Sequence, residues 1–166
     1  MKTDKIYLVG FMAAGKTSVA QDLGRRLDWR VEDVDARIEE RERRSIADVF
    51  SQEGEPYFRA VERQVVLDLI PLRHAVVATG GGTFLDSDSR AIIKTDGAVF
   101  WLDVPLVELV DRMPQDGSRP LATTIAQLER LYLLRRAAYE EAHVRIDAAS
   151  QSVGALVDLI LDWLET

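Results

Sequence analysis

Short apolar runs alternate with helical patterns along the whole chain. Each apolar run has the length of a buried strand, and the segments between runs repeat apolar residues every three or four positions. This alternation is typical of a three-layer α/β fold, in which a parallel sheet has helices on both faces. It predicts five strands, at residues 5–9, 30–34, 75–79, 98–102 and 144–147.

The longest interval between predicted strands separates the second strand from the third. Helical patterns lie near residues 35–43, 46–52 and 55–70 within it. We interpret residues 35–70 as an insertion that holds a second substrate. The last helical pattern, over residues 153–164, is expected to pack on the sheet, and a partner-binding helix is the alternative.

Residues 112–124 lack apolar periodicity and contain many turn formers. We interpret this segment as a mobile lid. Its two arginines, Arg112 and Arg119, would bracket a lid that closes over phosphates and excludes water. The chain has no internal repeat or low-complexity stretch, and its length suits one domain. We therefore expect residues 1–166 to form a single domain.

Composition narrows the range of functions. The net charge is −7, from 28 acidic residues against 21 Lys and Arg, which argues against broad nucleic-acid binding. No apolar run approaches the ~20 residues that span a bilayer, so we expect a soluble protein with no membrane partner. The chain has no cysteine, which excludes disulfides and thiolate metal sites and suits a cytoplasmic location.

Residues 10–17 read GFMAAGKT and match the pattern G-x-x-x-x-G-K-[ST]. In this pattern a strand turns into a helix and directs backbone N–H groups at a polyphosphate. Lys16 would follow the terminal phosphates, and the Thr17 hydroxyl would ligate Mg²⁺. The alternative, a glycine-rich turn without a ligand, is disfavoured because an apolar strand precedes the motif and an amphipathic helix follows it.

Two aspartates follow the second predicted strand, at the sheet edge where open α/β sheets bind ligands. Asp33 and Asp35 are separated by one residue, so they point the same way in an extended segment. We expect Asp33 to hold Mg²⁺ and Asp35 to bind a substrate hydroxyl and accept its proton, with helix capping by Asp35 as the alternative. Asp103, which follows the fourth strand, is a rival metal ligand. We rank it below Asp33, because the following Val104-Pro105 predicts a helix that Asp103 would cap.

Two further segments carry candidate substrate contacts. Gly80, Gly81 and Gly82 follow the third strand, and three successive glycines suit a place where a ligand approaches the main chain closely. Arg59 can bind a carboxylate in bidentate fashion, and Glu62 on the same helix face would orient it. The alternatives are a plain flexible turn and a surface salt bridge.

These motifs, taken in order, resemble those of the shikimate kinase family over nearly the whole chain. The matching segments are GFMAAGKT, EDVDARIE, GEPYFRAVE, ATGGG, WLDVP, SRPL and RRAAYEEA. The resemblance implies ATP-dependent phosphorylation of the 3-hydroxyl of shikimate, in aromatic amino-acid biosynthesis. It also implies a P-loop fold with a five-stranded sheet of order 2-3-1-4-5. We expect a monomer whose partner is the small molecule shikimate.

The resemblance also assigns roles on the nucleotide side of the site. Lys16 would stabilise the transferring phosphate, Thr17 would ligate Mg²⁺, and Asp33 would reach the metal through water. Arg112 would lie against adenine, and Arg119 would close onto phosphates with the lid. The full set of expected nucleotide-binding residues is Ala13, Ala14, Gly15, Lys16, Thr17, Ser18, Arg112 and Arg119.

On the substrate side, the resemblance implies that Asp35 holds the ring hydroxyls and acts as the base. Arg59 and Arg135 would clamp the substrate carboxylate, and Gly81 and Gly82 would offer main-chain contacts. The catalytic set is then Lys16, Asp35 and Arg119.

The chain departs from the family pattern in several places. Ala13 stands where the family usually has glycine, and the loop tolerates alanine there only if the backbone keeps φ negative. Ala137 replaces a common proline, and we prefer Arg135 to Arg136 as the carboxylate ligand because Arg135 lies four residues before Tyr139. Two other functions stay open: another small-molecule P-loop kinase, acting on gluconate or a nucleotide, and a non-catalytic nucleotide-binding module.

Overall fold

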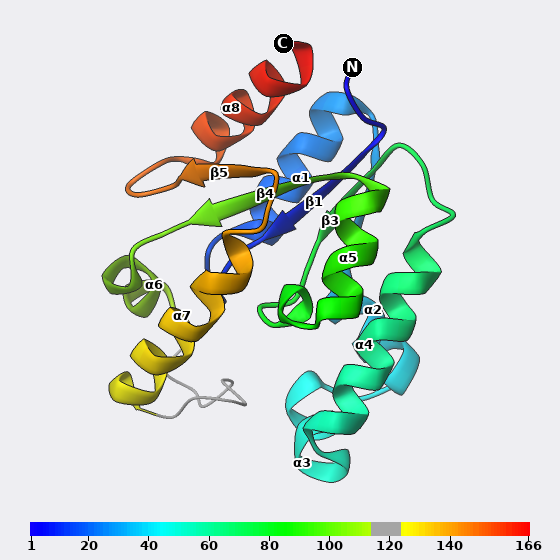
Figure 1. Ribbon diagram of the computed structural model, residues 1–166, viewed down its shortest axis with the longest axis vertical. Coiled ribbons are helices and arrows are strands. Elements are labelled where there is room, and N and C mark those ends of the chain that lie inside the picture. The colour runs from blue at the N-terminus through cyan, green and yellow to red at the C-terminus, as the bar shows by residue number, and fades with distance from the viewer. Residues whose placement is uncertain (114–123) are drawn as a thin grey trace.

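The computed structural model describes residues 1–113 and 124–166 and contains one five-stranded sheet (Figure 1). Every neighbouring pair of strands is parallel, and their order is β2-β3-β1-β4-β5, as predicted. The strands are β1 (Lys5–Val9), β2 (Arg30–Asp33), β3 (Ala75–Ala78), β4 (Ala98–Asp103) and β5 (Val144–Asp147). The prediction of an α/β fold with a 2-3-1-4-5 sheet is therefore confirmed.

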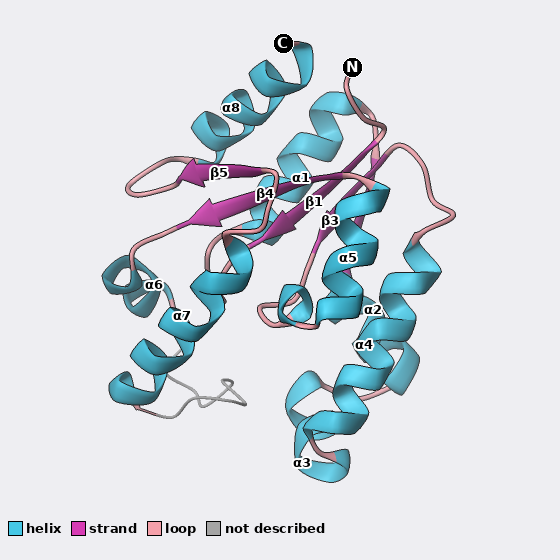
Figure 2. Ribbon diagram, viewed as in Figure 1, coloured by secondary structure: helices cyan, strands magenta, loops and turns pink. Residues whose placement is uncertain are grey.

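Helices cover both faces of this sheet (Figure 2). Helices α1 and α8 pack against each other, and α5 lies on the opposite face (Figure 1). The helices are α1 (Lys16–Leu27), α2 (Val34–Glu42), α3 (Ile46–Glu53), α4 (Glu55–Leu69), α5 (Ser87–Asp96), α6 (Leu106–Arg112), α7 (Ile125–Tyr139) and α8 (Val153–Glu165), with a short 3₁₀ helix η1 (Thr83–Leu85).

Helix starts differ from the sequence prediction in two places that matter for the site. Asp33 ends β2 and caps α2, because its side chain accepts a hydrogen bond from the Ala36 amide. Asp35 therefore lies in the first turn of α2, and both its extended conformation and its alternative role as a helix cap were wrong. Asp103 does not cap α6 either, because Pro105 occupies the N-cap position.

The core lies where apolar strands meet apolar helix faces. All five residues of β1 are buried, as are Leu156, Val157, Ile160 and Leu164 of α8. The expected packing of the last helix is therefore confirmed. Within the described residues, no helix combines the length and apolarity needed to cross a membrane.

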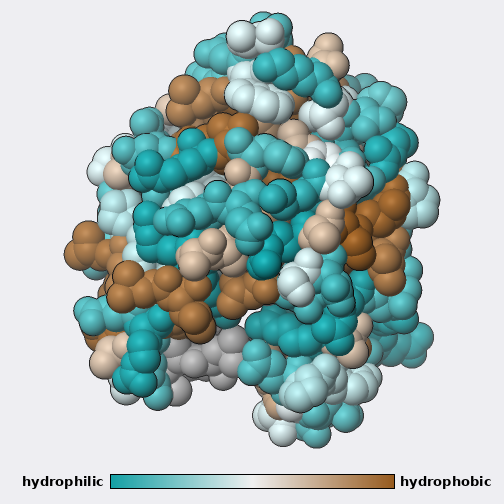
Figure 3. Space-filling model, viewed as in Figure 1, coloured by the Kyte–Doolittle hydropathy of each residue, from teal (hydrophilic) through white to brown (hydrophobic). Residues whose placement is uncertain are grey.

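The face of the molecule in Figure 3 is largely hydrophilic. Apolar side chains gather at its lower left, over α7, where Leu133 and Leu134 are each 67% exposed. These leucines and Leu131 line a groove with a volume of about 600 Å³, together with Gln127 and Arg130.

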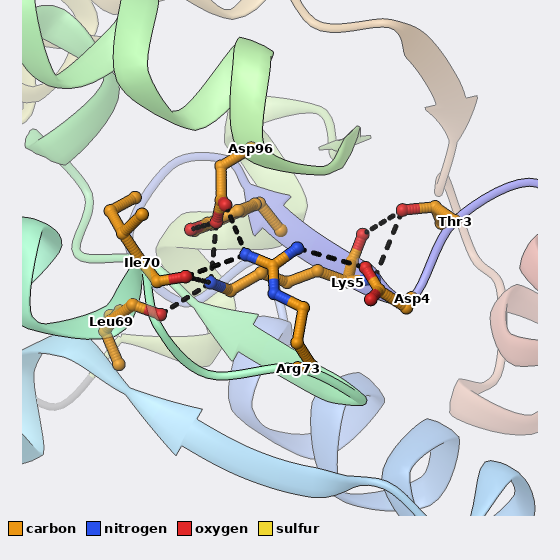
Figure 4. A network of polar contacts seen from close by, with 8 residues as sticks. Thr3, Asp4, Lys5, Leu69, Ile70, Arg73 and Asp96 are labelled. Carbon is orange, nitrogen blue, oxygen red and sulfur yellow. Dashed lines mark hydrogen bonds and ion pairs between the residues drawn. The ribbon is translucent and has the colours of Figure 1, made fainter.

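A fully buried lysine anchors the amino-terminal edge of the sheet (Figure 4). Lys5 begins β1, and its ammonium donates hydrogen bonds to the carbonyl oxygens of Leu69 and Ile70, at 2.5 and 3.2 Å. The same nitrogen lies 2.6 Å from Asp96, which also pairs with Arg73. Burial lowers the pKa of Lys5, and Asp96 opposes that effect. The cluster ties the carboxyl ends of α4 and α5 to β1.

Both chain termini lie at the top of Figure 1, the end of the molecule opposite α3. The phosphate loop and the residues that follow β2 and β3 leave the carboxyl edge of the sheet instead. The predicted binding residues and the termini therefore occupy different parts of the molecule.

Candidate active site

The phosphate loop joins β1 to α1 and turns at two glycines. Gly15 has φ +95° at the N-cap position of α1, and a Cβ at Gly10 would lie 2.9 Å from the carbonyl oxygen of Leu102. Among the described residues, no side chain caps the amino end of α1. Its first amides are therefore available to an anion.

Ala13 adopts the left-handed conformation, with φ +66°. The condition under which alanine would be tolerated here, a negative φ, is therefore not met. A Cβ makes this conformation costly, and strained backbone of this kind persists where the surrounding structure enforces it. The loop therefore keeps the geometry that glycine would favour and accepts the strain.

Lys16 is almost completely buried beneath this loop. Its ammonium donates hydrogen bonds to the carbonyl oxygens of Gly10 and Phe11. Burial lowers the pKa of Lys16 to about 8, while the nearby Asp35 opposes the shift. At neutral pH the group is thus mainly cationic, and it lies among the loop residues that would contact phosphate.

Thr17 and Asp33 fit a magnesium ion held jointly with phosphates. The Thr17 hydroxyl donates a 3.0 Å hydrogen bond to Asp33, so two oxygen ligands face each other at the start of α1. The described ranges contain no cluster of three or more His, Cys, Asp or Glu side chains suited to a metal. Because Mg²⁺ commonly takes one or two protein ligands plus phosphates and water, this sparse pair is sufficient.

The glycine turn, residues 80–82, brings three predicted substrate ligands together. A Cβ built on the first, second and third glycine would lie 2.7, 2.8 and 2.5 Å from side-chain atoms of Asp35, Arg135 and Arg59, respectively. A side chain at any of these positions would therefore displace the carboxylate or guanidinium group that faces it. The turn is glycine-rich because functional groups approach its main chain closely, which disfavours the plain flexible turn.

Asp35 is half-buried between the phosphate loop and the glycine turn. Burial is the main cause that raises the pKa of Asp35 to about 6. Lys16 opposes this shift, and the carboxylates of Asp33 and Glu62 contribute to it. A carboxylate with a pKa near neutrality is suited to accept a proton and release it again.

A chain of buried hydrogen bonds orients Arg59. Its Nη1 donates a 2.8 Å hydrogen bond to Glu62, which is only 1% exposed, so the alternative of a surface salt bridge was wrong. The second oxygen of Glu62 accepts a 2.9 Å bond from Thr83, whose hydroxyl accepts the Gly80 amide. Thr83 was not among the predicted site residues, although a hydroxyl residue directly after three glycines was a usable signal.

Arg135 is buried beside the glycine turn, with 3% of its surface exposed. Within the described part of the chain, its Nε has no hydrogen-bond partner. Its guanidinium carbon lies 5.5 Å from the Phe11 ring centre, and burial lowers its pKa. Tyr139, one helical turn later, donates a hydrogen bond to the Gly81 carbonyl. A buried, incompletely satisfied cation in a substrate site favours an anionic ligand.

Arg136 points to a different partner. It donates a 2.7 Å hydrogen bond to Asp103, and Arg145 binds the second oxygen of the same buried carboxylate at 2.7 Å. Asp103 is thus paired with two arginines, which makes it a poor candidate for a metal ligand. The geometry favours Arg135 over Arg136 as the residue that faces a substrate.

The structure describes only one of the two arginines in the predicted lid, Arg112. Arg112 ends α6, and its Nη1 donates a long 3.4 Å hydrogen bond to the Ala13 carbonyl, so it lies beside the phosphate loop. Arg119, and residues 114–123 of the predicted lid 112–124, lie outside the described residues.

Comparisons with known proteins identify relatives along almost the whole chain. A family model described as shikimate kinase matches residues 12–165. The shikimate kinase of Sulfurihydrogenibium sp. is 38% identical, over 94% of this chain and 95% of the relative. That of Persephonella marina is 37% identical, over 94% and 96%.

A solved structure gives the same result in three dimensions. Shikimate kinase from Acinetobacter baumannii, in complex with shikimate, has a TM-score of 0.94 and 33% identity, covering 98% of this chain and 93% of that one. Sequence and structure agree over the same length. The chain therefore belongs to the shikimate kinase family, whose members are ATP-dependent kinases that transfer phosphate to a hydroxyl group.

Proposed function

We propose that this chain transfers the γ-phosphate of ATP to the 3-hydroxyl of shikimate. The observation that carries the proposal is the convergence of Asp35, Arg59 and Arg135 on the glycine turn. Shikimate presents one carboxylate and several hydroxyls on a small ring. Such a ligand requires guanidinium groups to bind its carboxylate and a hydrogen-bond acceptor to bind its hydroxyls.

The two arginines are prepared for a carboxylate in different ways. Glu62 holds the guanidinium of Arg59 in one orientation, which reduces the entropy lost on binding. Arg135 is buried with an unsatisfied Nε within the described residues, so a substrate carboxylate would relieve a costly charge. Together they would fix the ring by one end, with the amides of Gly81 and Gly82 alongside.

Asp35 would bind the hydroxyl that attacks the phosphate and take its proton. Its pKa of about 6 places the carboxylate mostly in the ionised form at neutral pH, ready to accept. Lys16 is close enough to influence that pKa and would stabilise negative charge on the transferring phosphoryl group. Phosphoryl transfer depends on such positioning and electrostatics, so no nucleophilic side chain is required.

The phosphate loop and the amino end of α1 would hold the nucleotide, with Arg112 against the adenine. Thr17 and Asp33 would hold Mg²⁺, Asp33 through water. When bound, Mg²⁺ neutralises charge on the terminal phosphates.

We further propose that residues 1–166 form one kinase domain, in which the insertion at residues 35–70 serves shikimate. The cysteine-free sequence suits a reducing cytoplasm.

A coupled assay of ADP release tests the activity. With Mg·ATP present, we expect ADP release to depend on shikimate and to exceed the ATP-only background by orders of magnitude. Gluconate and nucleoside monophosphates serve as alternative acceptors in parallel reactions. The proposal fails if shikimate produces no ADP above background, or if one of the other acceptors is clearly preferred.

A further inference from the structure

Arg90 holds the far side of the glycine turn, and neither its position nor its role was apparent from the sequence. Arg90 lies on α5. Its Nη1 donates hydrogen bonds to the carbonyl oxygens of Phe84 and Leu85, at 3.0 and 3.2 Å. These carbonyls belong to η1, which begins directly after the turn. The guanidinium thus restrains the backbone that leaves the turn.

The same guanidinium reaches a second element. Its Nε lies 2.8 Å from a carboxylate oxygen of Glu141, two residues beyond the end of α7. Helix α7 carries Arg135 and Tyr139, the residues that contact the middle of the glycine turn. Arg90 therefore connects η1 with the end of α7, and only 20% of its side chain is exposed.

The rest of the turn is held by few contacts. Thr83 binds the Gly80 amide, Tyr139 binds the Gly81 carbonyl, and the Leu85 amide donates to the Gly82 carbonyl. Three consecutive glycines lose much conformational entropy on folding, so a turn of this composition depends on such restraints. Without Arg90, the end of the turn at Gly82, which faces Arg59, would be the least restrained part of the turn.

We infer that Arg90 is a positioning residue for the shikimate site, which acts through the glycine turn and the end of α7. This inference rests on the proposed function. It predicts a selective effect, because Arg90 touches elements of the shikimate side and none of the phosphate loop. Weaker restraint of the turn should impair shikimate binding and leave ATP binding nearly unchanged.

Arginine suits this position because its guanidinium is a rigid, planar fork. One nitrogen serves two carbonyls, while another faces the carboxylate. A lysine has a single nitrogen and would satisfy one partner at the expense of the other. Arg90→Lys should therefore retain part of the function that Arg90→Gln loses.

Steady-state kinetics of three variants test the inference. We expect Arg90→Gln to raise KM for shikimate about tenfold and Arg90→Lys about threefold, with KM for ATP within about twofold of the parent. The matched control is Arg63→Gln, because Arg63 pairs with Asp86 near the same turn but contacts none of its carbonyls. The control should leave both KM values within about twofold.

Two results would overturn the inference: an unchanged KM for shikimate in Arg90→Gln, or an equal rise in both KM values. If Arg90→Gln does not fold, calorimetry on Glu141→Gln replaces it. That variant should bind shikimate about threefold more weakly, and unaltered affinity contradicts the inference. An inactive parent protein would instead refute the proposed function, so the two failures are distinguishable.

Discussion

The methyl group of Ala13 makes the left-handed backbone of the phosphate loop costly at this position. Ala13 has φ +66°, where alanine is disfavoured and glycine is not. We expect Ala13→Gly to stabilise the protein by about 0.5–1 kcal/mol, because the relief of strain exceeds the added entropy of the unfolded chain. Urea denaturation measures the change.

Ala14→Gly is the control for this experiment. Ala14 is adjacent, lacks a positive φ and is buried, so glycine there adds entropy to the unfolded chain and also removes a buried methyl group. It should destabilise the protein by about 1–2 kcal/mol. If both variants destabilise the protein equally, the backbone at Ala13 is not strained.

Two shifted pKa values predict the dependence of catalysis on pH. Asp35 must be ionised to accept a proton, and its pKa is raised to about 6, so kcat/KM should fall below about pH 6. Lys16 must be protonated to stabilise phosphate, and its pKa is lowered to about 8, so kcat/KM should also fall above about pH 8. A rate profile from pH 5 to 9 tests both limbs. A flat profile across that range would argue against both roles.

Ionisation of Asp35 is expected to favour activity and to oppose folding. The pKa of Asp35 is higher in the folded protein than in the unfolded chain, so ionisation of Asp35 opposes folding above about pH 6. We expect Asp35→Asn to lose most turnover yet to melt at a higher temperature than the parent at pH 8. The difference in melting temperature should shrink as the pH falls towards 4. Full activity in Asp35→Asn would remove Asp35 from the mechanism.

At the scale of residues, sequence reasoning identified groups but not their partners. Arg59, Glu62 and the glycines were found because their chemistry is local in sequence. The pairing of Asp103 with Arg136 was not, because it joins a strand end to a helix 33 positions away. The role of Thr83 was also not predicted, because its partner Glu62 lies on another helix.

At the scale of elements, the buried ammonium of Lys5 is expected to support α4 and α5 together. Lys5→Met should destabilise the protein by about 2–3 kcal/mol, because carbonyls of α4 lose their donor and Asp96 loses one cation. Lys2→Met is the control, since Lys2 is exposed and lies over the Trp163 ring. We expect it to change stability by less than about 0.5 kcal/mol, as measured by urea denaturation. Equal effects of the two variants would contradict the anchoring role.

Periodicity predicted the positions of the strands more accurately than the starts of the helices. All five strands lie within one residue of their predicted ranges. Three of them, β1, β3 and β4, are fully buried apolar runs, which leave little choice of position. The start of α2 was harder to place. Capping by Asp33 begins the helix at Val34, and this competes with the extended reading of the Asp33–Asp35 segment.

At the scale of the whole molecule, one sheet separates two kinds of polar cluster. The carboxyl edge holds Lys16, Asp35 and Arg135, whose environments shift their pKa values. The amino edge holds Lys5 and Asp96, which tie helices to β1. The parallel α/β pattern was sufficient to predict this site edge, because open α/β sheets bind ligands at the carboxyl ends of their strands. The buried lysine at the other edge was not predictable, because strand periodicity does not indicate a charged core residue.

The location of the termini has a practical consequence for attaching the protein to a surface. Both ends lie at the end of the molecule opposite α3, while the proposed binding residues lie at the carboxyl edge of the sheet (Figure 1). A biosensor chip or bead coupled through either terminus should leave the substrate entrance facing the solution. We expect immobilised protein to bind shikimate with the same affinity whichever end carries the tether. A loss of affinity specific to one tether would show that this terminus lies closer to the site than the fold indicates.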